Sequence, residues 1–172
     1  MATLVLTLIG TDRAGLVSAV SRLVDARGGS WERSQLSHLG DVFAGVVEVA
    51  VPAAEVEALV ADVEALAADG LRVTVERTGS KVAGPGRRMR LRLVGADHPG
   101  IVAEVSSLLA GHGVNVEELN TRVVDAPMAG GTLFEAEVVV GVPDSVDVGE
   151  LGSALEELAH SLMVDTELVE VD

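Results

Sequence analysis

The sequence predicts an α+β protein in which one unit, of the order strand, helix, strand, strand, helix, strand, occurs twice. The first observation is a duplicated Gly-x-Asp-x-x-Gly turn at residues 10–15 and 95–100, between an apolar strand and an amphipathic helix. The second is that the apolar positions after the turn match in both copies. They are Leu16, Val20, Leu23 and Val24 against Ile101, Val105, Leu108 and Leu109. Self-similarity at a fixed offset indicates duplicated structure.

The offset also predicts where the two copies differ. Phe43 and Pro52 recur as Phe134 and Pro143, which gives an offset of 91 instead of the 85 that separates the turns. The second copy therefore has about six extra residues, which we assign to the loop 126–131. Such an insertion costs little free energy in a surface hairpin.

The apolar spacing defines the elements of the first copy. Gly28 follows a helical stripe, Gly40-Asp41 separates the two arms of a hairpin, and Gly70 follows a second helical stripe. The expected strands and helices are, in chain order, residues 3–10, 15–26, 30–39, 42–51, 53–68 and 71–78. The second copy repeats this order at residues 89–95, 100–110, 114–124, 132–142, 148–162 and 164–171.

Six elements in this order form a ferredoxin-like βαββαβ sandwich, with both helices on one face of an antiparallel sheet. We expect two such domains in tandem, residues 1–79 and 89–172, joined by a linker at 80–88. A unit of about 85 residues buries only a little over half of its unfolded surface. We therefore expect each half to pack against the other or against a second chain, and a homodimer follows as an expectation.

The helix-free faces of the two sheets differ in charge. In the second copy, Arg90 and Arg92 are expected beside Glu135 and Glu137 on the neighbouring central strand, as cross-strand ion pairs that face water. The matching positions of the first copy are uncharged: Val5, Thr7, Ala44 and Val46. An uncharged open face on one half suggests the hypothesis that a partner surface covers it.

Composition limits the compartment and the core. The chain has 172 residues, 48% of them hydrophobic, with a mean hydropathy of +0.41, but its aromatics are only Trp31, Phe43 and Phe134. The core must therefore consist mainly of Val, Leu and Ala, with Trp31 expected to join it. The absence of cysteine removes disulfides and thiol chemistry and suits a reducing compartment. The opening apolar run is too short to span a bilayer, so we expect a cytoplasmic protein without a membrane segment.

A net charge of −15 disfavours direct contact with nucleic acid, which would repel this surface. The one basic cluster, at residues 81–92, overlaps the linker and is interpreted as a solvated connector. Copper chaperones need a cysteine pair and RNA-recognition modules need stacking aromatics, so both classes are excluded. Neither a nucleotide-binding glycine loop nor a nucleophile elbow is present, and no cofactor is expected.

The strand, the Gly-x-Asp-x-x-Gly turn, the Ile/Leu-Val pair that follows it and the segment Gly113-Val-Asn-Val116 resemble the ACT domain, twice over nearly the whole chain. More narrowly, residues 10–17 and the hairpin 34–43 resemble the glycine cleavage system transcriptional repressor family, which is also a stand-alone tandem. This resemblance implies an amino-acid-sensing regulator that has no catalytic role.

The residues give a physical reason for amino-acid binding at the turns. Glycines let a ligand approach the backbone, and the following helix N-terminus offers free N–H groups and partial positive charge to a carboxylate. Asp97 can accept hydrogen bonds from an ammonium group, and Asn115 can bridge either group from the start of the next strand. The candidate ligand-binding residues are Gly10, Asp12, Arg13, Ala14, Gly15, Leu16, Gly95, Asp97, His98, Pro99, Gly100, Ile101 and Asn115.

Each polar candidate has a structural alternative. Asp97 stands shortly before Pro99, a usual arrangement for a helix N-cap, and capping is still more favoured for Asp12. Asn115 has the alternative of a turn residue. The four histidines lack a paired ligand spacing, so a metal site is not expected, and only His98 is placed to meet a ligand. No convergent acid, base and nucleophile indicates an active site.

The favoured hypothesis is a cytoplasmic sensor of a small amino acid, of the glycine or serine class, that modulates a transcriptional regulator through protein contact. The alternative is a regulatory subunit, or a detached regulatory region, of a folate or amino-acid enzyme similar to formyltetrahydrofolate deformylase or phosphoserine phosphatase. The enzyme hypothesis requires catalytic residues on this chain or its neighbour, and the sequence offers none.

Overall fold

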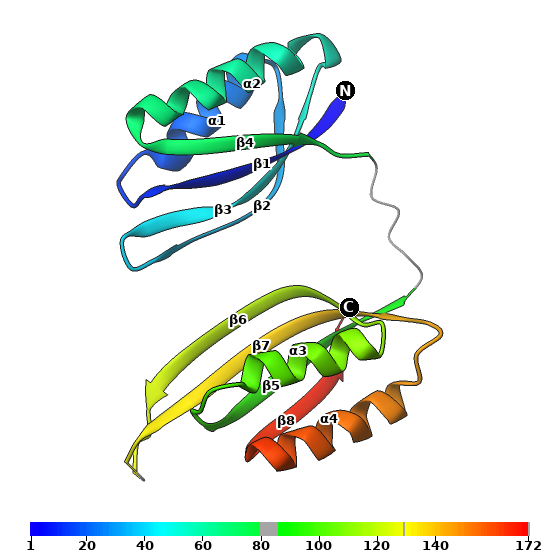
Figure 1. The fold of residues 1–172 in the computed structure, drawn as a ribbon. Helices are drawn as coiled ribbons and strands as arrows, with labels where there is room; N and C mark the ends of the chain where they lie inside the picture. Colours follow the sequence, from blue (N-terminus) through cyan, green and yellow to red (C-terminus); the bar gives the residue numbers. More distant parts are fainter. Residues whose placement is uncertain (80–85, 129, 172) are drawn as a thin grey trace. The chain divides into compact units, whose positions relative to one another are not determined.

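The computed structural model describes residues 1–79, 86–128 and 130–171. The chain divides into two compact units, Met1–Val82 and Ala83–Asp172, here called domain 1 and domain 2. In each unit a four-stranded antiparallel sheet has two helices on one face (Figure 1). The predicted fold class, two ferredoxin-like βαββαβ sandwiches in tandem, is confirmed.

Domain 1 has the sheet order β2-β3-β1-β4. Its elements are β1 (Ala2–Thr11), α1 (Leu16–Ala26), β2 (Ser30–Leu39), β3 (Val42–Val51), the 3₁₀ turn η1 (Ala53–Glu55), α2 (Val56–Glu64), the 3₁₀ segment η2 (Ala65–Asp69) and β4 (Leu71–Arg77).

Domain 2 has the equivalent order β6-β7-β5-β8. Its elements are β5 (Gly86–Ala96), α3 (Ile101–Gly111), β6 (Asn115–Asp125), β7 (Thr132–Pro143), α4 (Val148–Leu162) and β8 (Val164–Glu170).

The structure departs from the sequence prediction at two places. The helix expected over residues 53–68 is α-helical only in α2 and has 3₁₀ geometry on either side, a common way for helix ends to tighten. The strand β5 begins at Gly86, so residues 86–88 of the expected linker belong to the sheet. The rest of that linker, residues 80–85, lies outside the described residues, as does residue 129 of the inserted loop. The other residues of that loop lie between β6 and β7, where the offset predicted them.

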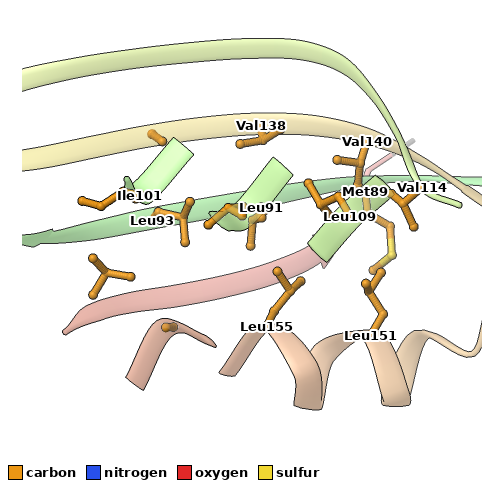
Figure 2. Close-up of a cluster of buried hydrophobic side chains, with 14 of the residues drawn as sticks. Met89, Leu91, Leu93, Ile101, Leu109, Val114, Val138, Val140, Leu151 and Leu155 are labelled. Atoms are coloured by element: carbon orange, nitrogen blue, oxygen red, sulfur yellow. The ribbon is translucent and has the colours of Figure 1, made fainter. Parts of the chain in front are cut away.

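Each domain has its own core, made where the apolar stripe of each helix meets the sheet. In domain 1, Leu4, Leu6 and Leu8 of β1 are at most 1% exposed. They pack with side chains of β3 and both helices, and Trp31 is partly buried against the same cluster, as expected. In domain 2 the corresponding cluster joins Leu91 and Leu93 of β5 to residues of α3 and α4 (Figure 2).

The end of the second helix differs between the domains in one informative way. Gly70 follows η2 with φ +82°, and the equivalent residue after α4, Met163, has φ +55°, the only positive φ at a non-glycine residue in the described chain. A left-handed conformation costs an L-residue about 1–2 kcal/mol, whereas glycine adopts it freely.

We therefore expect Met163→Gly to stabilise domain 2 by up to about 1 kcal/mol. The greater conformational entropy of glycine in the unfolded chain offsets the rest of the strain that is relieved. The side chain of Met163 is 75% exposed, so little packing is lost. Thermal unfolding followed by circular dichroism checks this expectation. A lower melting temperature for the variant would contradict it.

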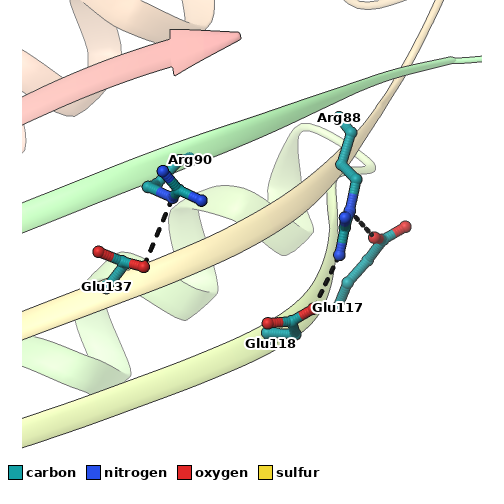
Figure 3. Close-up of polar contacts among 5 residues, drawn as sticks. All are labelled: Arg88, Arg90, Glu117, Glu118 and Glu137. Atoms are coloured by element: carbon teal, nitrogen blue, oxygen red, sulfur yellow. Dashed lines mark hydrogen bonds and ion pairs between the residues drawn. The ribbon is translucent and has the colours of Figure 1, made fainter. Parts of the chain in front are cut away.

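The open face of the domain 2 sheet, on the side away from the helices, carries ion pairs. Nε of Arg90 lies 3.4 Å from Oε1 of Glu137, and Nε of Arg92 lies 3.5 Å from its Oε2 (Figure 3 shows the Arg90 pair). The expected pairing is confirmed for Glu137. Glu135 instead pairs with Arg122, because Arg122 of β6 lies directly opposite it in the register.

Candidate functional site

The two Gly-x-Asp-x-x-Gly turns occupy equivalent places, between the first strand and the first helix of each domain. In domain 1 the backbone N–H of Asp12 donates to the carbonyl of Asp41 at 2.8 Å. In domain 2 the N–H of Asp97 donates to the carbonyl of Thr132 at 3.0 Å. Both acceptors lie at the hairpin beside the turn. The same hydrogen bond therefore ties each turn to the tip of its own hairpin.

Each turn ends on a glycine that opens the helix. Gly15 is the N-cap of α1 with φ +93°, and Gly100 is the N-cap of α3 with φ +100°. No side chain accepts a hydrogen bond from the first amides of either helix. Asp12 and Asp97 therefore do not cap α1 and α3. The first amide groups of a helix have no partner within the helix, and they carry partial positive charge. Asp12 and Asp97 are exposed, and each lies three residues before the N-cap of its uncapped helix.

The first glycine of each turn serves the packing of the domain itself. A Cβ atom on Gly10 would lie 2.6 Å from the carbonyl oxygen of Gly70. A Cβ atom on Gly95 would lie 2.6 Å from Cγ1 of Val164 and 2.7 Å from the carbonyl oxygen of Met163. These glycines therefore leave room for the residues that follow the second helix of the domain. We expected a ligand to contact these two glycines closely, but the protein itself does so.

A cationic side chain in each turn holds the end of the second helix. Nη2 of Arg13 donates to the carbonyl of Asp69 at 2.7 Å. At the equivalent position, Nε2 of His98 lies 2.8 Å from the carbonyl oxygen of Leu162, and its Nδ1 lies 3.0 Å from that of Pro99. Cations are favoured at helix C-termini, where the carbonyl groups carry partial negative charge. We call this contact the latch of each domain.

The latch of domain 2 depends on protonation. Only the imidazolium form has two N–H donors for two carbonyl acceptors. The hydrogen bond with Leu162, followed by that with Pro99, raises the pKa of His98 above its ordinary value of 6.5. The nearby charge of Asp97 raises this pKa further, while burial lowers it. In domain 1 the latch residue is arginine, which stays charged at every pH at which proteins fold.

This difference gives a pH prediction. Since the pKa of His98 is higher in the folded state, its stabilising contribution is complete below pH 6.5 and is lost as the pH rises through the folded-state value. We expect the loss of thermal stability caused by His98→Ala to be largest in mildly acidic buffer and to shrink in alkaline buffer.

Melting temperatures of wild type and variant, measured side by side from mildly acidic to alkaline pH, check this prediction. Arg13→Ala is the matched control, and its effect should not change over the same range. An effect of His98→Ala that is constant with pH would show that the ring acts only by packing.

An apolar groove lies next to the turn of domain 2, between α3 and the strands β6 and β7. The groove is shallow, with a volume of about 30 Å³. It is lined by Leu93, Ile101, Val102, Val105, Ser106, Leu109, Val116, Leu119, Phe134, Ala136 and Val138. Ile101 therefore both lines the groove and carries the first amide of α3.

The structure places the predicted site residues in different roles. Asp12, Ala14, Gly15, Asp97, Pro99 and Gly100 are exposed in the turns. The side chains of Leu16 and Ile101 are core residues, only 4% and 2% exposed, so they can offer a ligand no more than their amides. Arg13 and His98 form the latches, and His98 faces two carbonyls of its own domain where we expected it to meet a ligand.

Asn115 does not lie at the turn of its own domain, so the structure does not bring these two predicted parts of the site together within domain 2. Asn115 pairs with Gly141 of β7, and Gly141 pairs with Arg88 near the start of β5. The turn lies at the other end of β5, where Gly95 pairs with Phe134. Seven strand positions, about 23 Å, separate Arg88 from Gly95. The physical reason is that α3 carries the chain back along the sheet before β6 begins.

The latch acceptors and the hairpin acceptors could not be predicted from the amino-acid sequence. All four are backbone carbonyl oxygens, which any residue provides, so the side chains of Asp41, Asp69, Thr132 and Leu162 give no signal. The available signal was the cationic residue at the same turn position in both copies, Arg13 and His98.

Two further properties of the described part of the chain bear on function. Residues 1–79, 86–128 and 130–171 contain no group of three or more His, Cys, Asp or Glu side chains that could hold a metal ion. Over the same ranges, no helix is both long and apolar enough to cross a membrane.

Comparison with known proteins agrees with the duplicated fold. The Glycine cleavage system transcriptional repressor of Escherichia coli is 24% identical to this chain over 161 residues, which cover 92% of this chain and 85% of the relative. A UPF0237 protein of Methanopyrus kandleri is 35% identical over 79 residues, which cover 45% of this chain and 81% of the relative.

Solved structures show the same arrangement of elements. A protein of unknown function from Galdieria sulphuraria is 32% identical and superposes with a TM-score of 0.88 over 99% of both chains. A candidate glycine cleavage system transcriptional repressor is 18% identical, with a TM-score of 0.72 over 99% of this chain and 98% of that structure, a likeness of fold alone. The ACT domain model matches residues 2–76 and 88–169. The chain therefore belongs to the ACT domain family, with two copies of the domain in tandem.

Proposed function

We propose that this chain is a regulatory protein without catalytic activity that senses a small amino acid of the glycine or serine class. The ligand binds at the turn between first strand and first helix, and its occupancy modulates a transcriptional regulator of glycine metabolism through protein contact. The name of the Escherichia coli relative, a repressor of the glycine cleavage system, supports the choice of pathway.

The observation that carries the proposal is the uncapped helix start beside an exposed aspartate, present in both domains. The free amides at the start of α3 are suited to a carboxylate, since they donate hydrogen bonds and lie at the positive end of the helix. Asp97, whose side chain does not cap α3, is the matching acceptor for an ammonium group. A zwitterion satisfies both groups at once.

The size of the adjacent groove supports the ligand class. The groove that begins at Ile101 is apolar and small, with a volume of about 30 Å³, which favours a ligand with a short side chain. We therefore place glycine and serine ahead of the larger amino acids.

The latch gives a route from ligand to partner. His98 is adjacent in sequence to Asp97 and contacts the end of α4, so a ligand that shifts the turn also shifts the hydrogen bond to Leu162. Coupling between two sites requires such an element with different contacts in the two states. The regulator would then bind the free chain and the ligand-bound chain with different affinity, through the surface formed by the helices.

Titration calorimetry of the full chain against the twenty amino acids tests the ligand. We expect saturable heat with glycine, serine or both. Flat heats throughout, or binding confined to bulky side chains, would contradict the proposal. Affinity capture from lysate with and without the bound amino acid then tests the partner, and a DNA-binding regulator whose recovery changes with the ligand is expected.

A further inference from the structure

The apolar groove of domain 2 is open to solvent at its end away from the turn, here called the far groove. Val116 and Leu119 of β6 line this end and are 37% and 48% exposed. Val116 pairs with Val140, six strand positions, about 20 Å, from Phe134, which lies beside the turn. The far groove is therefore separate from the place at Ile101 that the amino acid would occupy.

Domain 1 fills the equivalent place with its own tryptophan. Val116 is equivalent to Trp31 at the offset of 85 residues that separates the two turns, and Leu119 is equivalent to Ser34. The strands β2 and β6 agree with this alignment, since each has a register shift directly after the first of these positions. The indole of Trp31 packs against the domain 1 core, and its Nε1 donates to Oγ of Ser34 at 3.2 Å. An indole thus covers in domain 1 the position that is open in domain 2.

The far groove offers what an indole needs. Its walls are aliphatic, so a flat ring that lies across it removes apolar surface of both groups from water. Ser106 of α3 also lines the groove. Its Oγ donates to the carbonyl of Ala103 at 3.2 Å and keeps the capacity to accept from an indole N–H. The groove is shallow, so the ring would stay partly exposed, as Trp31 is in domain 1.

The chain has no aromatic side chain to place in the far groove. It holds one tryptophan, two phenylalanines and no tyrosine. Trp31 and Phe43 pack against the core of domain 1, and Phe134 is 7% exposed in the core of domain 2. A second copy of this chain therefore cannot fill the far groove, and the aromatic group must come from a different molecule.

The charge of the chain indicates which kind of molecule this is. The elements α3 and β6 together carry four carboxylates, Glu104, Glu117, Glu118 and Asp125, and one guanidinium, that of Arg122. The whole chain has a net charge of −15, so its field favours a cationic partner. Aromatic side chains that enter an apolar pocket anchor many protein interfaces.

We propose that the far groove is the docking site for a protein partner that presents a tryptophan among basic residues. In this arrangement the partner supplies to domain 2 the ring that domain 1 carries in its own sequence. Only the identity of the partner, a transcriptional regulator, rests on the proposed function.

Amide chemical shifts of the ¹⁵N-labelled full chain, titrated with N-acetyltryptophanamide, test the aromatic site. This probe has neither a free carboxylate nor an ammonium group, so the result does not depend on amino-acid binding at the turns. We expect saturable shifts at Ser106, Val116 and Leu119, and at least about tenfold weaker binding of N-acetylalaninamide, which lacks the ring. No saturable shift at these amides, or equal binding of both probes, would overturn the proposal.

Val116→Trp with Leu119→Ser transfers the residues of domain 1 to domain 2 and should weaken binding of the probe at least about tenfold, because the new indole covers the groove. Domain 1 holds this pair on an equivalent strand, so the variant should stay folded, which circular dichroism verifies. Val169→Trp is the matched control, since it adds an indole at a 40% exposed position on β8, at the opposite edge of the sheet from β6. Undiminished binding by the double variant, or loss of binding by the control, would contradict the docking site.

The reverse exchange, Trp31→Val with Ser34→Leu, opens the groove of domain 1 and gives an independent measurement. A second set of saturable shifts, at the amides of residues 31 and 34, is expected with the same probe. A folded variant without these shifts would show that the two grooves are not equivalent and would overturn the proposal.

Two capped peptides test the class of partner. Each has one tryptophan, flanked by two pairs of lysines in one peptide and by two pairs of glutamates in the other. The basic peptide should bind at least about fivefold more tightly at low ionic strength, with a smaller difference at high salt, because salt screens the attraction. Equal affinities for the two peptides would exclude a basic protein partner and favour a free aromatic ligand.

Discussion

Gly95→Ala is expected to destabilise domain 2 by about 2–3 kcal/mol, the cost of forcing an extra methyl group into packed structure. The new Cβ would lie 2.6 Å from Cγ1 of Val164 and 2.7 Å from both Cα of Val164 and the carbonyl oxygen of Met163. Two of these atoms are backbone, so the strand that follows α4 must move. In a domain of this size, that cost lowers the melting temperature by roughly 10 °C or more.

Gly10→Ala should have an effect of similar size in domain 1, where the new Cβ would lie 2.6 Å from the carbonyl oxygen of Gly70. The two effects can be separated, because the single tryptophan, Trp31, lies in domain 1. Tryptophan fluorescence should follow the loss caused by Gly10→Ala, and circular dichroism should detect both.

Gly152→Ala is the control for the introduction of a methyl group. Gly152 lies inside α4 and a Cβ there would meet no atom within 4 Å. Alanine in a helix interior is favoured over glycine by about 0.5–1 kcal/mol, so this variant should be more stable than wild type. Equal stabilities for Gly95→Ala and wild type would show that the turn and β8 are less closely packed than the structure has them.

Asp97→Asn is expected to weaken binding of the amino acid by about tenfold or more. A hydrogen bond to a charged group contributes roughly 1.5–3 kcal/mol, and the amide of asparagine removes the negative charge that the ammonium group requires. The side chain does not cap α3, and the backbone N–H of residue 97 still donates to Thr132. Thermal stability should therefore stay close to that of wild type.

Asp165→Asn is the matched control for this change, since it removes the same charge from an exposed position on β8. Calorimetric titration with glycine and serine should give the wild-type affinity for this variant. If Asp97→Asn bound the ligand as tightly as wild type, the ammonium group would not lie at the turn of domain 2. Asp12→Asn gives the same test for domain 1.

The elements and their order followed from the sequence because most of them combine a clear period with a glycine or proline boundary, and because the set of elements occurs twice. The hairpin about Gly40-Asp41 and the inserted loop between β6 and β7 are cases in which the repeat sharpened the prediction. The aspartate caps were wrong because local preference favours Asp near a helix start, whereas here a glycine with positive φ occupies the N-cap of α1 and of α3.

The candidate site was less accessible to sequence reasoning. Asn115 lies fifteen residues after Gly100 in the sequence. Eleven of those residues form α3, which returns the chain by about 16 Å. The latch acceptors are backbone carbonyls at the end of the second helix, so the partners of Arg13 and His98 depend on how the chain packs. The duplication made both turns visible, and only the structure shows what each turn contacts.

The most direct test of amino-acid sensing at the turns is a titration of ¹⁵N-labelled protein with glycine and with serine, followed by amide chemical shifts. We expect saturable shifts of the amides that begin α1 or α3, at residues 16–18 or 101–103, with unchanged resonances in the middle of α4. Amides at both helix starts that stay unshifted while calorimetry detects binding would contradict binding at the turns, because the carboxylate would then be held elsewhere.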